Sequence, residues 1–142
     1  MSTDSTTKFA FVCVQNAGRS QMSTAFAERE RERRDLEDSV EILTGGTHLA
    51  DHVHEEVVDV MEQEGVDLSD RTPREVSTAE LESCDVVATM GCSTLEFDAE
   101  TVDVRDWALD DPDGKEMGQV QQIRDDIEQR VISLFDEYHP DD

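Results

Sequence analysis

The chain has 142 residues without an internal repeat, which suits one domain with a single core, and it carries 36 acidic against 12 basic residues for a formal net charge of −24. Because the acids are spread along the whole chain, the composition excludes an acidic disordered tail and a basic face for nucleic acid, and it favours a cytoplasmic protein of a salt-accumulating halophile. There is no apolar run of membrane-spanning length and no signal peptide, so we expect no membrane partner.

Strands and helices are expected to alternate along the chain. After a frayed tail over residues 1–7, the apolar runs predict strands at Phe9–Val12, Val40–Leu43, Val86–Met90 and Thr101–Val104. The helical patterns lie at Ser20–Arg34, from about Val53 to Gly65, at Ser77–Ser83 with a capping box of Ser77 and Glu80, and around Val120–Leu134. This order predicts a single α/β domain over residues 1–142, with a parallel four-stranded sheet and helices on both faces. The charged second half of the first helix, Glu28–Glu37, is expected to project into solvent.

A cysteine lies at the expected junction between the first strand and the first helix. Cys13 and Arg19 are separated by five residues, and Ser20 follows. A strand, a tight loop and a helix aim backbone N–H groups at one point, where a tetrahedral oxyanion can bind with Arg19 on two of its oxygens. The same field stabilises a thiolate, so we expect Cys13 to be the nucleophile. The alternative is a buried cysteine beside a surface arginine. The loop expected to bind the oxyanion consists of Val14, Gln15, Asn16, Ala17, Gly18, Arg19 and Ser20.

A second candidate group lies in the loop before the last helix. Asp110 and Asp111 precede Pro112 and follow the fourth expected strand. Because the carboxyl ends of parallel strands meet at one edge of a sheet, this loop is expected on the same side as Cys13. An attacking cysteine needs an acid to protonate the leaving oxygen; Asp111 is the first candidate and Asp110 the second. The alternative is an ordinary acidic turn, and Trp107 is expected to anchor the core.

From about Lys8 to Val131, the chain resembles the low-molecular-weight protein tyrosine phosphatase superfamily and, within it, the arsenate reductases. The shared motifs are Cys-x-x-Asn-x-x-Arg-Ser at Cys13–Ser20, a Gly-Gly-Thr segment after the second strand, Asp-Leu-Ser at Asp67–Ser69, and the Asp-Pro loop. Thr89-Met90-Gly91-Cys92 is similar to reductases coupled to a low-molecular-weight thiol. The phosphatases commonly carry aromatic residues after the Asp-Pro, where this chain has Asp113, and an anionic side chain suits a small inorganic oxyanion better than an aryl phosphate.

The resemblance implies a role for each matching residue. Cys13 is the nucleophile, Arg19 clamps the oxyanion, and Asp111 is the general acid. Asn16 and Ser20 organise the loop and its thiolate.

The other two cysteines differ in what they are expected to do. By the resemblance, the thiol that resolves the Cys13 adduct is either Cys92, after the third strand, or an external low-molecular-weight thiol. Thiol-dependent relatives often have a further cysteine where this chain has Glu96. Cys84 lies before the same strand, roughly 23 Å from Cys92 along an extended chain, which is beyond disulfide reach. We expect Cys84 to be a buried, small apolar residue.

The sequence therefore predicts an arsenate reductase that binds an arsenate or phosphate oxyanion, holds no cofactor and depends on an external thiol reductant. The alternative enzyme is a phosphatase that hydrolyses phosphate monoesters through a phosphocysteine. A non-enzymatic alternative is an oxyanion-binding or redox-sensing module. His48, His52 and His54 lie close together in sequence, but their spacing does not favour a metal site, and none is expected.

Overall fold

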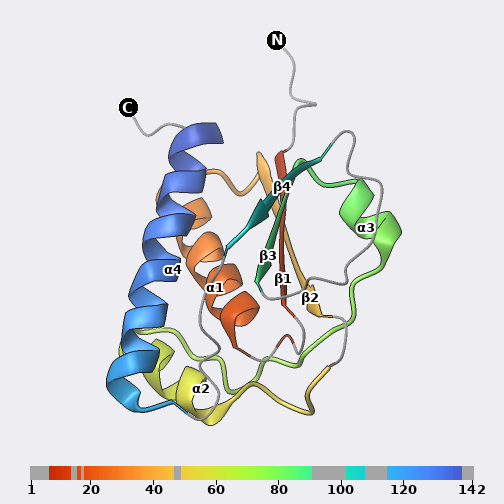
Figure 1. Cartoon of the computed structure of the whole chain (residues 1–142). Helices are drawn as coiled ribbons and strands as arrows, with labels where there is room; N and C mark the ends of the chain where they lie inside the picture. The colour runs from red at the N-terminus through yellow and green to blue at the C-terminus, as the bar shows by residue number, and fades with distance from the viewer. Residues whose placement is uncertain are drawn as a thin grey trace.

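The computed structural model describes residues 7–13, 16, 18–46, 49–90, 102–107 and 115–138. In this part of the chain the strands and helices follow one another in the expected order: β1 Thr7–Cys13, α1 Arg19–Arg33, β2 Val40–Gly46, α2 Glu55–Glu62, α3 Thr78–Glu82, β3 Val86–Met90, β4 Asp103–Asp106 and α4 Met117–Tyr138. The strands form one parallel sheet in the order β2-β1-β3-β4. Helices α1 and α4 lie together on one side of the sheet with α2 at their end, and α3 lies on the other side (Figure 1). The predicted fold class is confirmed.

Strand β2 is longer than its apolar run predicts. The expected strand ended at Leu43, yet β2 continues to Gly46, because its last three residues pair with β1 up to Cys13. The segment 74–76 lies beside the same end of β2. The N–H of Gly46 donates to the Arg74 carbonyl at 2.9 Å. A Cβ built on Gly45 would stand 2.4 Å from the Cβ of Val76, so only glycine permits this close approach. Strand β4 is also shifted, since it begins at Asp103 and not at Thr101.

The core lies between the sheet and the pair α1 and α4. Phe9 of β1 packs edge-on against Phe135 and Tyr138 of α4, with ring centroids 5.3 and 5.6 Å away. Phe11 contacts Trp107 at 5.8 Å between centroids. Trp107 is 6% exposed, so its expected role as a core anchor is confirmed.

The charged segment Glu28–Glu37 projects into solvent only in part. Glu32 and Glu37 are exposed, as predicted, but the prediction is wrong for Glu30. Glu30 is 6% exposed and accepts hydrogen bonds from Arg33 and Arg34, each at 2.8 Å to Oε2. Arg34, whose side chain is 4% exposed, also reaches Asp136 of α4 at 2.7 Å. The bond from Arg33, together with that from Arg34, holds the pKa of Glu30 below its usual range despite burial. Charged residues are buried here because each has a partner of opposite charge on the same or the neighbouring helix.

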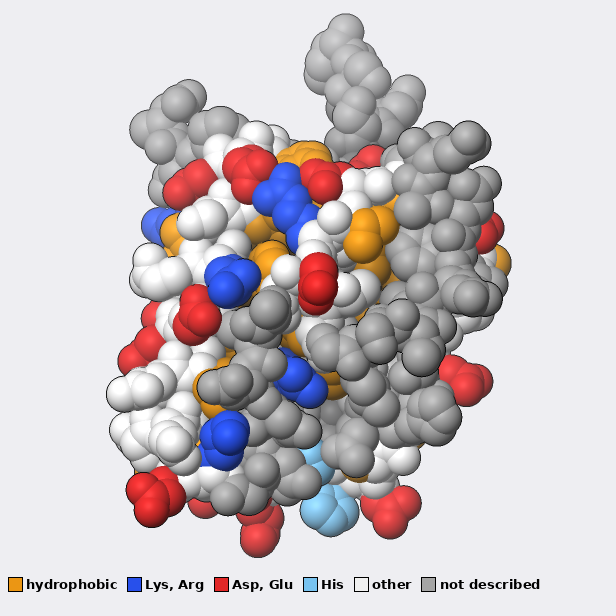
Figure 2. All heavy atoms as spheres, in the orientation of Figure 1, with side chains coloured by type: hydrophobic (Ala, Val, Ile, Leu, Met, Phe, Trp, Pro, Cys, Tyr) orange, Lys and Arg blue, Asp and Glu red, His pale blue; other side chains and the backbone are white. Residues whose placement is uncertain are grey.

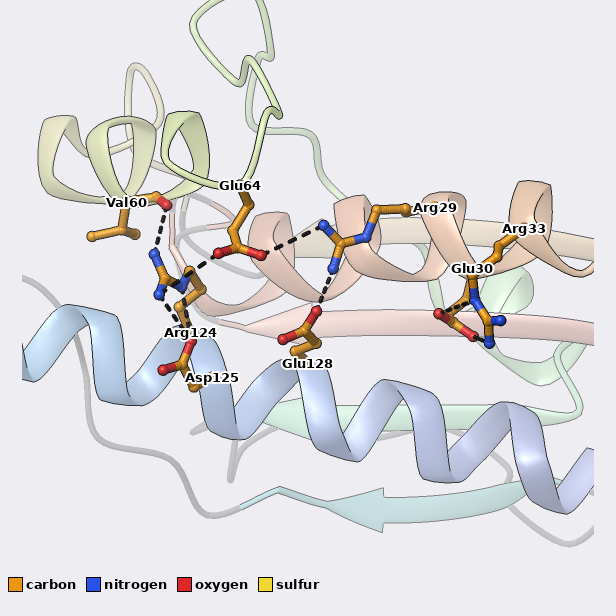
Figure 3. Close-up of polar contacts among 8 residues, drawn as sticks. All are labelled: Arg29, Glu30, Arg33, Val60, Glu64, Arg124, Asp125 and Glu128. Atoms are coloured by element: carbon orange, nitrogen blue, oxygen red, sulfur yellow. Dashed lines mark hydrogen bonds and ion pairs between the residues drawn. The ribbon is translucent and has the colours of Figure 1, made fainter.

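Two arginines join α1, α2 and α4 (Figure 3). Arg29 of α1 pairs with Glu64, just after α2, and with Glu128 of α4. Arg124 of α4 is 8% exposed and donates to the Val60 carbonyl at 3.0 Å. Its guanidinium also lies 3.8 Å from the Glu64 carboxylate. Each guanidinium thus bridges two helical elements, as its forked geometry allows.

The surface of the described residues is mostly charged and polar. Carboxylates are spread over the face shown in Figure 2, with basic side chains between them. The large apolar side chains that are exposed are Leu49, Val104 and Met117, which come from separate parts of the chain. Within the described ranges, no helix has the length and apolar character needed to cross a membrane.

We expect Arg124→Met to lower the free energy of unfolding by about 2–4 kcal/mol, because it removes a nearly buried cation and leaves its acceptors without their donor. The measurement is denaturant unfolding at fixed salt. The matched control is Arg130→Met on the same helix, where an exposed pair with Asp126 at 3.1 Å is lost and the change should stay within about 0.5 kcal/mol. Equal effects of the two substitutions would contradict the assignment of Arg124 as a structural bridge.

Candidate active site

The site is built where the carboxyl ends of the central strands meet the start of α1. Cys13 is the last residue of β1, and it lies beside Gly46 of β2 and Met90 of β3. Its side chain is buried, with 3% of the residue exposed. This is the edge of a parallel sheet at which ligands bind in α/β folds.

The sulfur of Cys13 has a hydroxyl partner from the first turn of α1. Sγ lies 2.8 Å from Ser20 Oγ, and either atom could donate. Ser20 Oγ also accepts a hydrogen bond from Asn16 Nδ2 at 2.7 Å. A thiolate has no proton, so Ser20 is the donor when Cys13 is ionised. The pair is therefore arranged to stabilise the nucleophilic form of the cysteine.

Asn16 lies between β1 and α1, and its side chain makes hydrogen bonds to several segments. It is fully buried and has a left-handed backbone with φ 52°, which Asn adopts more readily than most residues. Besides Ser20, its Nδ2 donates to Thr44 Oγ1 at 2.8 Å. Its Oδ1 accepts from the Arg74 backbone N–H at 2.9 Å and from Gln21 Nε2 at 3.1 Å. All the hydrogen-bonding positions of this carboxamide are filled, so its orientation is fixed.

Helix α1 begins at Arg19, directly after this connection. Its N-cap is Gly18, and no hydrogen bond from an N-cap side chain covers the first turn. The N–H groups of a first helical turn have no partner within the helix and bind anions readily. Ser23 Oγ donates to the Arg19 carbonyl at 2.8 Å and fixes the backbone there. These features fit the predicted oxyanion site around Arg19.

Several predicted site residues lie outside the described residues. They are Val14, Gln15, Ala17, Cys92, Asp110 and Asp111. Strand β4 ends at the same edge as Cys13, since Asp106 pairs with Thr89 and Met90 pairs with Cys13. Asp111 remains the predicted general acid and Cys92 a candidate for the resolving thiol.

Cys84 lies at the opposite end of β3 from the site. It is 4% exposed and its Sγ contacts the Glu80 carbonyl at 3.3 Å. Burial raises the pKa of its thiol to about 11. Cys84 lies six positions before Met90, which is about 20 Å along an extended chain, so it cannot reach Cys13 in the folded protein. The expectation that Cys84 is a buried, unreactive residue agrees with this environment.

Sequence reasoning missed the residues that hold Asn16 from outside the loop, namely Gln21, Thr44 and Arg74. The Arg74 side chain donates to the Thr44 carbonyl at 3.1 Å and pairs with Glu80 at 2.8 Å. Glu80 belongs to the predicted capping box of α3, which is present. The bond from the Ser77 N–H, followed by that from Arg74, lowers the pKa of Glu80. The capping box, which the sequence predicts, therefore includes the carboxylate that binds the Arg74 side chain, and the Arg74 backbone in turn holds Asn16.

His52 and His54 are described, whereas His48 is not. Among the described residues, no group of three or more His, Cys, Asp or Glu is arranged to hold a metal ion.

The chain is similar to proteins of one family. Residues 8–141 match the family described as low molecular weight phosphotyrosine protein phosphatase. Over 142 residues, and the whole of both chains, it is 87% identical to the Halobacterium salinarum protein named "Putative arsenate reductase". That source agrees with the halophilic composition.

Two solved structures are similar over most of this chain. One is the Corynebacterium glutamicum thioredoxin-dependent arsenate reductase, with a TM-score of 0.78 and 28% identity; the match covers 94% of this chain but spans only 62% of that one. The other is an arsenate reductase in the phosphate binding state, with a TM-score of 0.78 and 27% identity over 92% of this chain and 98% of that one.

Cys84 should resist alkylation in the folded protein. With its pKa raised to about 11, roughly three in ten thousand molecules carry the thiolate at pH 7.5. The measurement is iodoacetamide labelling at that pH, followed by peptide mapping, with denatured protein as the control for complete labelling. Labelling of Cys84 at the rate of Cys13 in the native protein would contradict the burial that the structure gives it.

Proposed function

The chain belongs to the low molecular weight phosphotyrosine protein phosphatase family, and we propose that within this family it is an arsenate reductase acting through Cys13. The observation that carries the proposal is the buried Cys13 thiol at the carboxyl end of β1, with the Ser20 hydroxyl 2.8 Å from its sulfur at the first turn of α1. The 87% identity to a relative named for arsenate reduction supports this substrate over a phosphate ester.

In the first step the Cys13 thiolate attacks the arsenic atom of arsenate. An S–As bond forms and one As–O bond breaks, and the leaving oxygen takes a proton from Asp111 to depart as water. Arg19 and the N–H groups at the start of α1 bind the remaining oxygens and stabilise their charge. Ser20, which donates to the thiolate before attack, holds the sulfur in line.

In the second step another thiol attacks the sulfur of Cys13. A disulfide bond forms, the S–As bond breaks, and its electron pair stays on arsenic, so As(V) becomes As(III) and leaves as arsenite. Cys92 or an external low-molecular-weight thiol supplies the attacking sulfur. An external thiol or dithiol then reduces the disulfide, which makes the enzyme dependent on a reductant but on no bound cofactor.

Membership of a family described as phosphatases supports a second candidate function, the hydrolysis of phosphate monoesters. The same site attacks a phosphate monoester, and water activated by Asp111 then hydrolyses the phosphocysteine. No second thiol takes part, so this activity is independent of reductant and of Cys92. The two reactions share Cys13 and Arg19 and differ only after the adduct has formed.

Arsenite release at high salt, with arsenate and a small thiol, is expected from the wild-type chain and not from Cys13→Ser, because a hydroxyl neither attacks arsenate at neutral pH nor forms a disulfide. Asp111→Asn should slow release by about 10²-fold through loss of the general acid. Cys84→Ala is the matched control and should keep full activity. An aryl phosphate, tested in parallel, identifies a phosphatase if it is hydrolysed while no arsenite appears.

The source of the second thiol is decided by Cys92→Ser. If Cys92 resolves the adduct, the variant should lose at least 10-fold in arsenite release, and wild-type protein should accumulate a Cys13–Cys92 disulfide when reductant is withheld. Peptide mapping without reduction detects that bond. Full turnover of Cys92→Ser with small thiols would assign resolution to the external thiol.

A further inference from the structure

Asn16 has a conformation that its surroundings must enforce. A left-handed backbone costs a non-glycine residue free energy, and it persists where neighbouring groups hold it. Asn16 has φ 52° and lies three residues after the nucleophile. The contacts that hold the Asn16 backbone therefore lie close to the nucleophile and to the start of α1.

Gln21 binds Asn16 at two points. Its Nε2 lies 3.1 Å from the backbone carbonyl of Asn16 and 3.1 Å from the side-chain Oδ1. Since both neighbours are oxygens that only accept, the amide nitrogen of Gln21 must face them. One side chain thus fixes the backbone and the carboxamide of Asn16 relative to each other. Gln21 is itself 1% exposed, so water does not compete for this contact.

The other end of the Gln21 amide makes no such contact. Its Oε1 is buried and has no hydrogen-bond partner among the described residues. The contacts that the structure gives the Gln21 amide are therefore the two that its N–H group donates to Asn16.

The hydrogen bonds from Gln21 to the nucleophile run in one direction. Gln21 donates to Asn16 Oδ1, the Asn16 amide donates to Ser20 Oγ at 2.7 Å, and Ser20 lies 2.8 Å from Cys13 Sγ. When Cys13 is a thiolate, every group in this series donates toward the sulfur. Hydrogen bonds in such a series polarise one another, so each donation strengthens the next.

We propose that Gln21 is a positioning residue for the nucleophile: it fixes Asn16 in its left-handed conformation and begins a series of donations that ends on the Cys13 thiolate. The proposal rests on the proposed function only in taking Cys13 as the nucleophile, and it holds equally for arsenate reduction and phosphate ester hydrolysis. Gln21 touches neither sulfur nor substrate, and its effect passes through Asn16 and Ser20.

The test is the pH profile of iodoacetamide alkylation at Cys13, followed by peptide mapping of the full chain at high salt. Gln21→Met keeps the length and apolar volume of the side chain and removes the donor. We expect its profile to move to higher pH by about half to one unit, which is about a three- to tenfold slower reaction below the midpoint. Gln21→Glu should shift the profile in the same direction, because its carboxylate opposes the two Asn16 oxygens.

Thr24→Val is the matched control. Thr24 is 3% exposed on the same helix and donates to the Ser20 carbonyl at 2.7 Å, outside the series that reaches the sulfur. It should leave the midpoint unchanged. A Gln21→Met profile that superimposes on the wild type, or an equal shift in Thr24→Val, would overturn the proposal. Wild-type Cys13 that reacts no faster than a denatured cysteine would instead count against the proposed function.

If Gln21→Met does not fold, as judged by circular dichroism, Gln21→Glu carries the test, because it preserves the shape of the side chain. An unshifted midpoint in folded Gln21→Glu would also overturn the proposal.

Discussion

The geometry of the predicted active site around Cys13 depends on one buried carboxamide, that of Asn16. Its four side-chain hydrogen bonds join the start of α1, the end of β2 and the backbone of Arg74 before α3. A buried amide is stable only when these partners are all present, because each missing one leaves a polar group without water or protein. The geometry of the Cys13 site is thus a property of the whole sheet edge and not of its loop alone.

The excess of acidic residues affects the packing of the helices and not the site around Cys13. With 36 acidic and 12 basic residues, repulsion opposes the compact state, and concentrated salt screens it between exposed charges. Pairs such as those of Arg34 and Arg124, whose side chains are 4% and 10% exposed, are screened much less. The few arginines therefore hold the helices together in conditions where surface pairs contribute little. The acid excess thus suits concentrated salt, whereas the buried ion pairs show how α1 and α4 stay packed.

Predictions from the sequence succeeded where residues near one another in the chain determine the local structure. The strand Val86–Met90 and the capping box at Ser77 have the predicted limits and contacts. Predictions failed where segments distant in the sequence decide, as at the end of β2, whose last residues pair with β1 and lie beside the segment 74–76. The burial of Glu30 in α1 was not predicted because hydrophobic periodicity cannot reveal a buried charge whose burial depends on arginine partners.

The sequence by itself determined the fold class and the closeness of Ser20 to Cys13, because a strand and a helix within eight residues leave few arrangements. It also marked Asn16. Only the tertiary structure decided what holds that residue. Thr44 and Arg74 lie 28 and 58 residues away in the chain. Gln21 is near in sequence, but no sequence pattern shows that its side chain donates to Asn16. Hydrogen bonds between distant segments leave no periodic trace in a sequence, since any polar residue at the right place in space can make them.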